Sequence, residues 1–437
     1  MAQDIQPLPG FRDFFPEECA VRNRIFESWR ATARAFGFEP YDGPPLESLE
    51  LFRKKSGEEI LGQLYHFTDK GDREVALRPE MTPTLARMIG ARGRALRRPI
   101  KWFSIPQLFR YERQQRGRLR EHYQFNCDIL GEPGVGADAE LVMVVIDALT
   151  RLGLAREDFV VRVSDRRLLG ALLLKCGVES EKLPQVLGIV DKITRETPDA
   201  IDKSLRESGI PADAAKRIVG LFAKTDLESL RAHADESPEV AAALLEVQKF
   251  FGIVEASGLG EFVQFDLGIV RGLLYYTGLV FEAFDRKGEF RAICGGGRYD
   301  QLLGGLTGLD LPAAGFGMGD VVLTEILKAR GKLPEYARDL DVYLVIVDDS
   351  LRPRAGLPLA RQLRDAGLAV EYSLEPLGVS KQFKQAGQSG ARFAVVVGPD
   401  EWKRGAVRVK DLSTGQEEEL RAADLPAYME KKVKREA

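Results

Sequence analysis

Cysteine and histidine are scarce in this chain of 437 residues. The four cysteines are spread along it, at Cys19, Cys127, Cys176 and Cys294, and the three histidines are His66, His122 and His233. No two cysteines form a CxxC pair, and the histidines are too scattered to complete a ligand set, so the sequence predicts no metal site. Unpaired cysteines in such small number are typical of a reducing compartment, and we expect the protein in the cytoplasm.

Long apolar runs are also missing. Stretches such as Phe393 to Val397 are far shorter than the roughly 20 residues that a membrane helix needs. The first residues, MAQDIQPLPGFRDFFPEE, have neither a basic start nor an apolar segment, so they do not resemble a secretory signal. The sequence therefore predicts a protein without a membrane partner.

An excess of one charge is missing as well, because 63 basic and 66 acidic residues leave a net charge of −3. Two local runs differ from this average. The segment RYERQQRGRLR, residues 110–120, has five arginines and one glutamate, and residues 87–101 have six basic residues and no acid. Either run alone is equally consistent with a solvated surface, but two runs close in sequence favour an anion-binding site.

The length suggests two or three domains. We expect a first helix over Cys19 to Phe36, where apolar residues recur at helical spacing, and a helical insertion at about 165–251. A linker near 334–339 precedes alternating strand and helix patterns. The predicted domains are residues 1–333, with the insertion, and residues 338–437.

The pattern from residue 101 to 130 predicts an antiparallel hairpin with the arginine-rich segment as its loop. On the second strand, alternate side chains form a polar face, and the residues between them form an apolar face. The polar face comprises His122, Gln124, Asn126 and Asp128. On the first strand, Arg110 and Glu112 would share a face. A solvent-exposed strand gives the same alternation, and a floor that binds a phosphate together with an amine is the alternative.

Five ordered segments resemble the histidyl-tRNA synthetase family. FRYERQQRGRLREHYQFNCDILGE resembles motif 2 of class II aminoacyl-tRNA synthetases in the form that this family uses. The other four are PLPGFRDFFPEE, LRPEMTP, VRGLLYYTGLVFE and CGGGRYDQLL. The segment VSKQFKQAGQSGARFAVVVG resembles part of the family's anticodon-binding domain, so the resemblance covers nearly the whole chain.

The resemblance implies an α+β fold of class II synthetase type. This fold has an antiparallel-sheet catalytic core with a helical insertion and a C-terminal α/β mixed-sheet anticodon-binding domain. It implies a histidine–tRNA ligase that activates L-histidine with ATP and Mg²⁺, transfers it to tRNA(His), and releases AMP and diphosphate. The family also implies a homodimer.

The resemblance further implies roles in ATP binding. Arg110 would bind the α-phosphate, Glu112 the adenine amino group, and Arg118 the outer phosphates. His122 stands where the family commonly has a phenylalanine that stacks on adenine. Arg271 would bridge the histidine carboxylate and the α-phosphate as a fixed cation, which makes Arg271 and Arg110 the expected catalytic residues.

Histidine offers an ammonium group, a carboxylate and a ring with two nitrogens. Glu80 and Thr82, which share a face if that segment is extended, would accept from the ammonium together with Gln124. Asp128 and one tyrosine would pair with the ring nitrogens, which would reject isosteres that lack them. The candidate tyrosines are Tyr275, Tyr276 and Tyr299, and core packing is the expected role of one of the first two. Arg110 and Arg271 complete the expected histidine site.

Two positions depart from the family pattern. Leu274 replaces an aspartate of the histidine signature, and Val322 replaces the arginine of motif 3 that holds the terminal phosphate. The ATP phosphates would then depend more on the loop arginines, which are Arg113, Arg116 and Arg118. Such departures also suit a non-catalytic regulatory subunit of histidine biosynthesis, or an RNA-binding or sensor protein. The retained Arg271, Glu80 and Gln124 and the C-terminal domain argue against the regulatory subunit. The missing arginine at Val322 is the only support for an RNA-binding or sensor protein.

Overall fold

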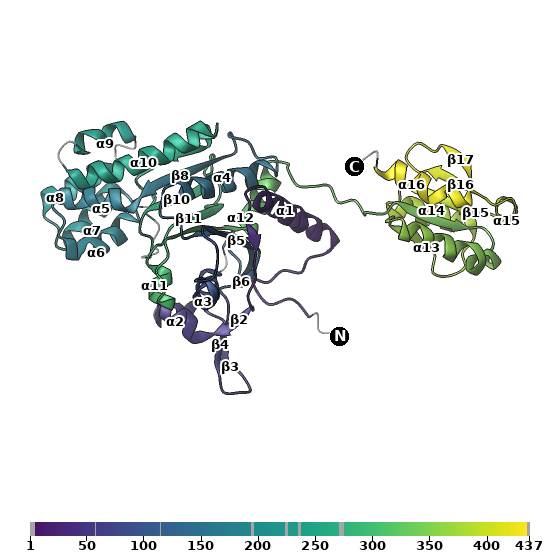
Figure 1. Ribbon diagram of the computed structural model, residues 1–437, viewed down its shortest axis with the longest axis horizontal. Helices are drawn as coiled ribbons and strands as arrows, with labels where there is room; N and C mark the ends of the chain where they lie inside the picture. The colour runs from purple at the N-terminus through teal and green to yellow at the C-terminus, as the bar shows by residue number, and fades with distance from the viewer. Residues whose placement is uncertain are drawn as a thin grey trace. The chain divides into compact units, whose positions relative to one another are not determined.

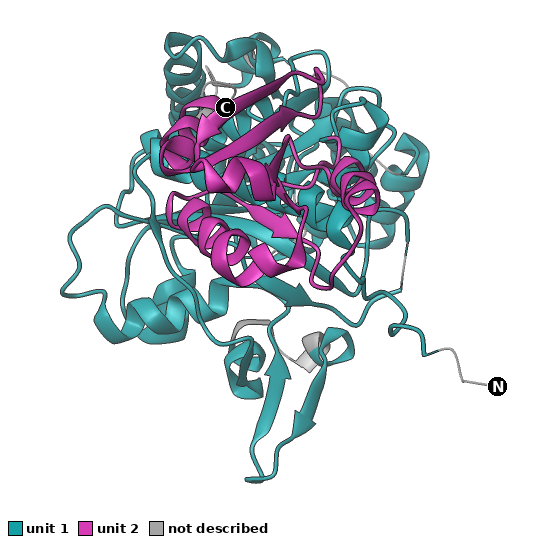
Figure 2. Cartoon of the chain, turned by 90° about the vertical axis from the view of Figure 1, so that its right-hand side faces the viewer, with its two compact units in different colours: residues 1–334 teal, residues 335–437 magenta. Residues whose placement is uncertain are grey.

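The chain folds into two compact units, residues 1–334 and residues 335–437 (Figure 2). The computed structural model describes residues 5–56, 58–113, 115–193, 196–222, 226–234, 237–270 and 275–434. Each unit has a hydrophobic core of its own, so each fulfils the packing requirement of a separate domain.

A large sheet forms the centre of the first unit (Figure 1). Its strand order is β1-β5-β7-β12-β11-β10-β8-β9, and β6 also pairs with β7. Its strands are β1 (Glu39–Pro40), β5 (Ile100–Ser104), β6 (Gln107–Phe109), β7 (Glu121–Leu130), β8 (Phe159–Asp165), β9 (Val263–Phe265), β10 (Leu279–Asp285), β11 (Cys294–Arg298) and β12 (Ala313–Gly319). The inner pairs are antiparallel, whereas β1–β5 and β8–β9 are parallel. The predicted α+β class with a largely antiparallel core is confirmed.

The first strand of the predicted hairpin is interrupted. β5 and β6 both pair with β7, and they keep one register, since Ser104 lies opposite Asn126 and Gln107 lies opposite Tyr123. Between them stands Pro106, which has no backbone N–H to donate. The Pro106 carbonyl still accepts from the Gln124 N–H at 3.1 Å, so the strand direction is preserved across the break.

Helices cover the apolar face of this sheet. Phe125 and Cys127 of β7 point into a core shared with Phe316 of β12, as the alternation predicts. The helices in contact with this core are α1 (Pro16–Ala35), α4 (Gly136–Thr150), α10 (Pro238–Ala256) and α12 (Asp320–Ala329). Trp29 of α1 stacks on Phe125 with ring centroids 5.5 Å apart. Helix α1 begins earlier than predicted, because Pro16 occupies a favourable first position for a helix.

The predicted insertion is helical and packs around its own core. Its helices before α10 are α5 (Arg166–Lys175), η2 (Ser180–Lys182), α6 (Leu183–Val190), α7 (Pro198–Glu207), α8 (Ala212–Phe222) and α9 (Leu227–Ala234). After α10, the short helix η3 (Gly260–Phe262) leads into β9. Helix α7 has an amphipathic pattern, with Ile201 and Leu205 buried one turn apart. This i, i+4 spacing is the signal that made the insertion predictable.

A small sheet, which the sequence did not reveal, stands apart from the large one (Figure 1). It is formed by β2 (Leu46–Ser48), β4 (Glu74–Leu77) and β3 (His66–Thr68), in that order. The helices around it are α2 (Leu49–Ser56), η1 (Glu58–Gln63) and α3 (Thr82–Arg92), and α11 (Leu302–Thr307) packs on α3. Strands of three or four residues are too short to show a clear alternation.

The second unit has a mixed sheet in the order β14-β13-β15-β16-β17, as its predicted class requires. Its strands are β13 (Val342–Ile346), β14 (Val370–Tyr372), β15 (Phe393–Val397), β16 (Ala406–Asp411) and β17 (Glu417–Arg421). Its helices are η4 (Asp349–Leu351), η5 (Arg352–Gly356), α13 (Leu357–Asp365), α14 (Val379–Ser389), α15 (Pro399–Lys403), η6 (Ala422–Asp424) and α16 (Leu425–Lys434). Strands β13–β15 pair in parallel, and β15, β16 and β17 pair antiparallel. Across the described residues of both units, no helix has the length and apolar character that crossing a membrane requires.

Candidate active site

The polar face of the large sheet forms the floor of a cavity of about 1100 Å³. The floor residues come from adjacent strands, and loops 110–119 and 286–293 supply further walls. On the floor lie His122, Gln124, Arg162, Glu282, Phe284, Gly295, Gly317 and Gly319. The strand register places these residues on one face of the sheet. Gly317 lies opposite Gly295, and Glu282 lies opposite both Gly295 and Arg162. The first part of the polar face of β7, with His122 and Gln124, therefore faces a cavity and not only bulk solvent.

Two glycines of β12 make room for the polar side chains of β7. A Cβ atom on Gly315 would lie 2.0 Å from Asp128 Oδ1, and one on Gly317 would lie 1.8 Å from Gln124 Nε2. Real Cβ atoms do not approach so closely, so the side chains of Asp128 and Gln124 can lie across β12 only because it carries glycine there. The glycine spacing of the GFGMG segment is thus part of the site, a signal that the sequence interpretation missed.

The glycines of β11 have different environments. Gly295 lines the cavity, whereas a Cβ on Gly296 would meet Phe316 Cβ at 2.5 Å and Phe281 Cζ at 2.6 Å on the apolar side. Gly295 and Gly296 differ because successive residues of a strand point to opposite faces, so Gly296 faces away from the cavity. Its small size serves helix-side packing.

Asp128 and Tyr299 form a buried pair beside this floor. The Tyr299 hydroxyl donates a hydrogen bond to Asp128 Oδ1. Burial raises the pKa of Asp128 to about 7, although the Tyr299 hydrogen bond acts in the opposite direction. Burial also raises the pKa of Tyr299, and the neighbouring Asp128 charge adds to that effect. The pair is therefore close to a change of charge at neutral pH.

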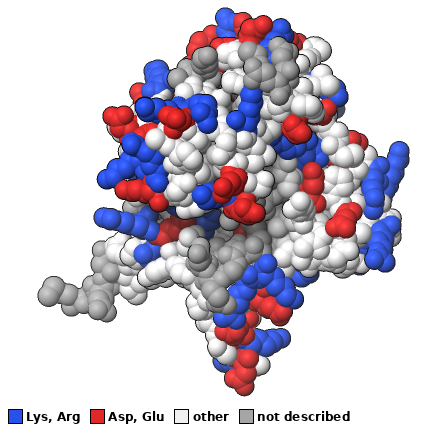
Figure 3. All heavy atoms as spheres, turned by 90° about the vertical axis from the view of Figure 1, so that its left-hand side faces the viewer, with Lys and Arg blue, Asp and Glu red and all other residues white. Residues whose placement is uncertain are grey.

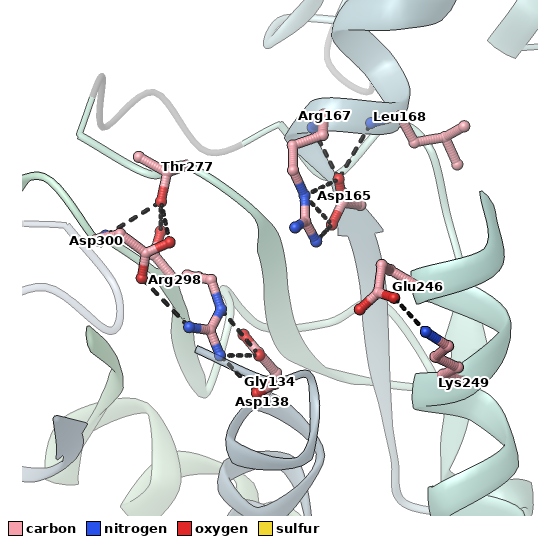
Figure 4. Close-up of polar contacts among 10 residues, drawn as sticks. All are labelled: Gly134, Asp138, Asp165, Arg167, Leu168, Glu246, Lys249, Thr277, Arg298 and Asp300. Atoms are coloured by element: carbon pink, nitrogen blue, oxygen red, sulfur yellow. Dashed lines mark hydrogen bonds and ion pairs between the residues drawn. The ribbon is translucent and has the colours of Figure 1, made fainter. Parts of the chain in front are cut away.

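Arg298, the last residue of β11 and the one before Tyr299, points toward Gly134 and Asp138 at the start of α4 (Figure 4). Arg298 Nη2 lies 2.5 Å from Asp138 Oδ2 and donates to the Gly134 carbonyl at 2.9 Å. Its Nη1 donates to Asp300 Oδ1 at 3.2 Å. Burial raises the pKa of Asp138 to about 6, against the opposing effect of the Arg298 charge. This ion pair ties the end of β11 to the start of α4.

A chain of hydrogen bonds runs along the polar face of β7. Gln124 Nε2 donates to Asn126 Oδ1 at 2.9 Å, and His122 Nε2 lies 3.2 Å from Gln124 Oε1. Since that oxygen can only accept, the Nε2 atom of His122 carries the proton. Burial and the Arg110 charge lower the pKa of His122 to about 3, so the ring is neutral at physiological pH.

Arg110 and Glu112 line the cavity, but they do so from the loop that follows β6. The prediction that they share a strand face is wrong, because the Glu112 N–H donates to the Arg110 carbonyl at 2.9 Å and closes a turn after Phe109. Arg110 Nε donates to the Pro79 carbonyl at 2.9 Å. The Glu112 carboxylate accepts a hydrogen bond from Arg118, so Glu112 and Arg118 form an ion pair.

Glu80 and Thr82 do not share an extended segment. Met81, between them, has φ −95° and ψ −23°, and Thr82 is the first residue of α3. Glu80 and Thr82 would share a face only in an extended segment. The helical φ and ψ of Met81 show that the segment is not extended. Within the described part of the chain, neither residue belongs to the cavity wall. The adjoining Pro79 carbonyl nevertheless places this segment next to Arg110.

The three candidate tyrosines lie together. The rings of Tyr275 and Tyr276 have centroids 4.8 Å apart, and those of Tyr275 and Tyr299 are 6.1 Å apart at 90°. Tyr276 is buried in the cluster that also contains Val280 and Leu85, so its ring is part of a core. The expected catalytic Arg271 and the departure at Leu274 lie outside the described residues.

Val322 lies in the cavity wall and is 8% exposed. A Cβ on Gly117 would be 3.2 Å from Val322 Cγ2, so the arginine-rich loop passes directly over it. Of the three loop arginines expected to compensate, Arg118 lines the cavity, whereas Arg116 is exposed and lies near Glu325 at 3.9 Å. Arg113 is exposed and is not among the described wall residues.

A buried ion cluster that the sequence did not reveal supports β7 from its other end. Arg12 Nε lies 2.6 Å from Glu121 Oε1, and Arg12 Nη2 lies 2.9 Å from Asp320 Oδ2. The second oxygen of Asp320 accepts the Tyr123 N–H at 2.9 Å. Burial raises the pKa of Asp320 to about 6, although Arg12 opposes this. The amino-terminal segment is thereby fastened to both β7 and α12.

The basic run at 87–101 lies outside this cavity, in α3, the segment after it and the start of β5. Its two ends are neutralised, since Arg87 Nη2 lies 2.8 Å from Glu47 Oε1 and Lys101 Nζ lies 2.6 Å from Glu140 Oε1. On the face of the molecule in Figure 3, basic and acidic side chains are similarly interspersed. In the described ranges, no group of three or more His, Cys, Asp or Glu side chains is placed to hold a metal ion.

Comparisons with known proteins agree over nearly the whole chain. Residues 10–320 match the family model described as histidyl-tRNA synthetase, and residues 341–432 match the anticodon binding domain. The chain is 48% identical to histidine–tRNA ligase of Opitutus terrae, with 95% of each chain covered. It is 43% identical to the chloroplastic/mitochondrial histidine–tRNA ligase of Arabidopsis thaliana, with 97% of this chain and 86% of the relative covered.

Two solved structures share the fold. A histidyl-tRNA synthetase from Nostoc sp. PCC 7120 matches with a TM-score of 0.83 at 25% identity, over 99% of this chain and all of that one. An ATP phosphoribosyltransferase regulatory subunit/histidyl-tRNA synthetase from Bacillus halodurans matches with a TM-score of 0.73 at 22% identity. That alignment covers 88% of this chain and 97% of the other, and at this identity it shows the fold alone.

Proposed function

Since this chain belongs to the histidyl-tRNA synthetase family and is a histidine–tRNA ligase, we propose that the cavity on the polar face of its large sheet is where ATP and L-histidine react. One observation carries this proposal. The same cavity brings arginines of the motif 2 loop next to β7, whose polar face ends in the buried Asp128–Tyr299 pair. Cations for phosphates thus adjoin acceptors for an amine and an imidazole.

In the first step, the histidine carboxylate attacks the α-phosphorus of ATP and diphosphate leaves. A terminal ribose hydroxyl of tRNA(His) then attacks the carbonyl carbon of the adenylate, and AMP leaves. Both steps develop negative charge on oxygen, so fixed cations contribute more than proton transfer by protein groups. We assign this role to Arg110 and Arg271. Arg110 is supported by its position, because the Pro79 carbonyl fixes Nε and leaves the other guanidinium donors to the cavity.

Arg118 and Glu112 form an ion pair that ATP would replace. Arg118 would move to the outer phosphates, and Glu112 would accept from the adenine amino group. Each group would exchange one charged or polar partner for another, so opening the pair costs little once the nucleotide is present. The neutral ring of His122, whose donor is already satisfied by Gln124, is suited to stacking on the base.

Histidine recognition is assigned to the other part of the floor. Gln124 on the floor would accept from the ammonium group, together with Glu80 and Thr82 of the segment that adjoins Arg110. The Asp128–Tyr299 pair would bind the ring nitrogens, and Tyr275, with Tyr276 packed behind it, would border the ring. Because the pair offers a carboxylate and a hydroxyl in a buried place, a ring without two polar nitrogens would leave one of them unsatisfied.

Several finer properties belong to the same proposal. Mg²⁺ enters with ATP as part of the substrate, and Glu282 on the cavity floor is a carboxylate that could face the ion. Residues 1–333 form the catalytic domain and residues 338–437 bind the anticodon. The match of residues 341–432 to the anticodon binding domain supports the second assignment. The enzyme works as a homodimer in the cytoplasm.

Charging of tRNA tests the function. Purified protein incubated with ATP, Mg²⁺, radioactive histidine and a tRNA(His) transcript should produce acid-precipitable histidyl-tRNA. A tRNA of another specificity is the control and should remain uncharged. A regulatory subunit or a plain RNA-binding protein would bind without charging either tRNA, which would contradict the proposal.

A further inference from the structure

Two loops meet at the wall of the cavity. The first is the arginine-rich loop, residues 110–120, and the second is the β10–β11 loop, residues 286–293. Arg291 Nη2 of the β10–β11 loop donates to the side-chain oxygen of Gln115. The Arg116 guanidinium lies 5.0 Å from the Phe290 ring centroid. Phe290 and Arg291 both line the cavity, so the second loop contributes directly to its wall.

The base of the β10–β11 loop is firmly held. The Glu289 N–H donates to Asp285 Oδ2 at 2.9 Å, and the Ile293 N–H donates to the Ala283 carbonyl at 2.8 Å. Arg330 pairs with Asp285 and lies 3.3 Å from Glu289 Oε2. The segment with Phe290 and Arg291 is therefore presented from a fixed base, as a ligand-binding side chain requires.

Beside these loops, Val322 forms an apolar part of the cavity wall. Val322 is almost completely buried, and its side chain lies next to Gly117 of the arginine-rich loop. A valine has no charge to offer a phosphate, so a cation for the outer phosphates must come from other residues of the cavity wall. Which residue binds the outer phosphates therefore depends on the charged side chains of the cavity wall.

The arginines that line the cavity differ in how their charge is compensated. Arg118 pairs with Glu112, and Arg162 Nη1 lies 3.4 Å from Asp266 Oδ2. Arg291, in contrast, is exposed and donates to the neutral amide of Gln115, and no carboxylate among the described residues lies within ion-pair distance of it. Exchanging the neutral amide oxygen for a phosphate oxygen is favourable, because the anionic acceptor adds an attraction between opposite charges that the amide does not offer.

We propose that Arg291 binds the outer phosphates of ATP and supplies the positive charge that Val322 does not. The inference rests on the proposed function of the cavity and adds a residue to it. Arg291 leaves Gln115 when the nucleotide binds, while Phe290 stays against Arg116 and keeps the two loops together. The β10–β11 loop thereby senses whether the nucleotide carries its β- and γ-phosphates.

Comparing ATP with AMP tests this assignment, because AMP lacks the outer phosphates. For Arg291→Ala we expect the affinity for ATP to fall about tenfold, with the affinity for AMP unchanged. Lys287→Ala is the matched control, since it removes one charge from the same loop at an exposed residue that is not among the described wall residues. This variant should bind both nucleotides as the wild type does. Arg291→Lys should keep part of the ATP affinity.

Titration of each protein with ATP and with AMP, followed by isothermal calorimetry, gives both affinities. Equal loss for ATP and AMP would overturn the proposal, because it would place Arg291 in general nucleotide binding. Unchanged ATP affinity in Arg291→Ala would also overturn it. Histidine-dependent tRNA charging by the wild type reports on the proposed function independently, so failure of one idea can be distinguished from failure of the other.

Discussion

The hydroxyl of Tyr299 reaches Asp128 across an intervening strand. Asp128 belongs to β7 and Tyr299 follows β11, while β12 lies between these strands. Gly315 of β12 is directly opposite both Asp128 and Gly297, and its missing side chain leaves the path for the hydrogen bond. The pair to which we assign recognition of the imidazole ring therefore depends on three strands, and β12 contributes to it by having glycine at position 315.

Gly315→Ala tests this arrangement. The added Cβ would lie 2.0 Å from Asp128 Oδ1, so the carboxylate must move away from Tyr299. We expect the KM for histidine to rise at least about tenfold, because a displaced polar group no longer pairs with the ring. Gly305→Ala is the control, since a Cβ there meets nothing within 4 Å. A histidine KM that is equal in the two variants would contradict the assigned path.

Asp128→Asn should change how stability depends on pH. The pKa of Asp128 in the folded protein is about 7, above the usual value of 3.8, so the folded state holds this proton more tightly than the unfolded chain. Its contribution to stability is fully present below pH 3.8 and is lost as the pH rises towards 7. Asparagine does not titrate. Relative to the wild type, the variant should therefore gain unfolding free energy between pH 5 and pH 8, measured by urea denaturation without ligands. Parallel curves for the two proteins would show that the Asp128 proton is not linked to folding.

Arg298→Ala should destabilise the protein by about 3–5 kcal/mol, because it leaves Asp138 buried without its partner. Arg298 and Asp138 are 3% and 1% exposed. The pair Lys249–Glu246, also drawn in Figure 4, is 2.7 Å long but lies on the surface. Lys249→Ala should cost less than about 1 kcal/mol. Chemical denaturation measures both losses, and similar values would contradict the structural role of Arg298.

Substitutions of His122 test the proposed stacking on adenine. His122→Phe should keep the KM for ATP within about threefold, whereas His122→Ala should raise it about tenfold through lost stacking. Since the pKa of His122 is about 3, His122→Phe should also leave the shape of the pH–rate profile unchanged above pH 5. An alanine variant with the ATP KM of the wild type would remove His122 from the adenine site.

The two faces of β7 could be predicted because polar and apolar residues alternate over residues 122–129. The second unit could be recognised because its strands and helices are separated by clear turns. In contrast, the Arg298–Asp138 pair joins residues 160 positions apart, and no local pattern connects them. The turn after Phe109 was missed for a similar reason, since residues 107–112 have no glycine or proline to mark its position. The use of glycine in β12 becomes clear only when Asp128 and Gln124 are seen to lie across it.

The most direct test of the central claim is histidine-dependent exchange of pyrophosphate into ATP, compared between the wild type and Arg110→Ala. The wild type should exchange only when histidine is present. Removal of a fixed cation beside the developing charge should lower kcat of the variant about 100-fold or more, with an unchanged melting temperature. Exchange by the folded Arg110→Ala variant at the wild-type rate, or no histidine-dependent exchange by the wild type, would contradict the account.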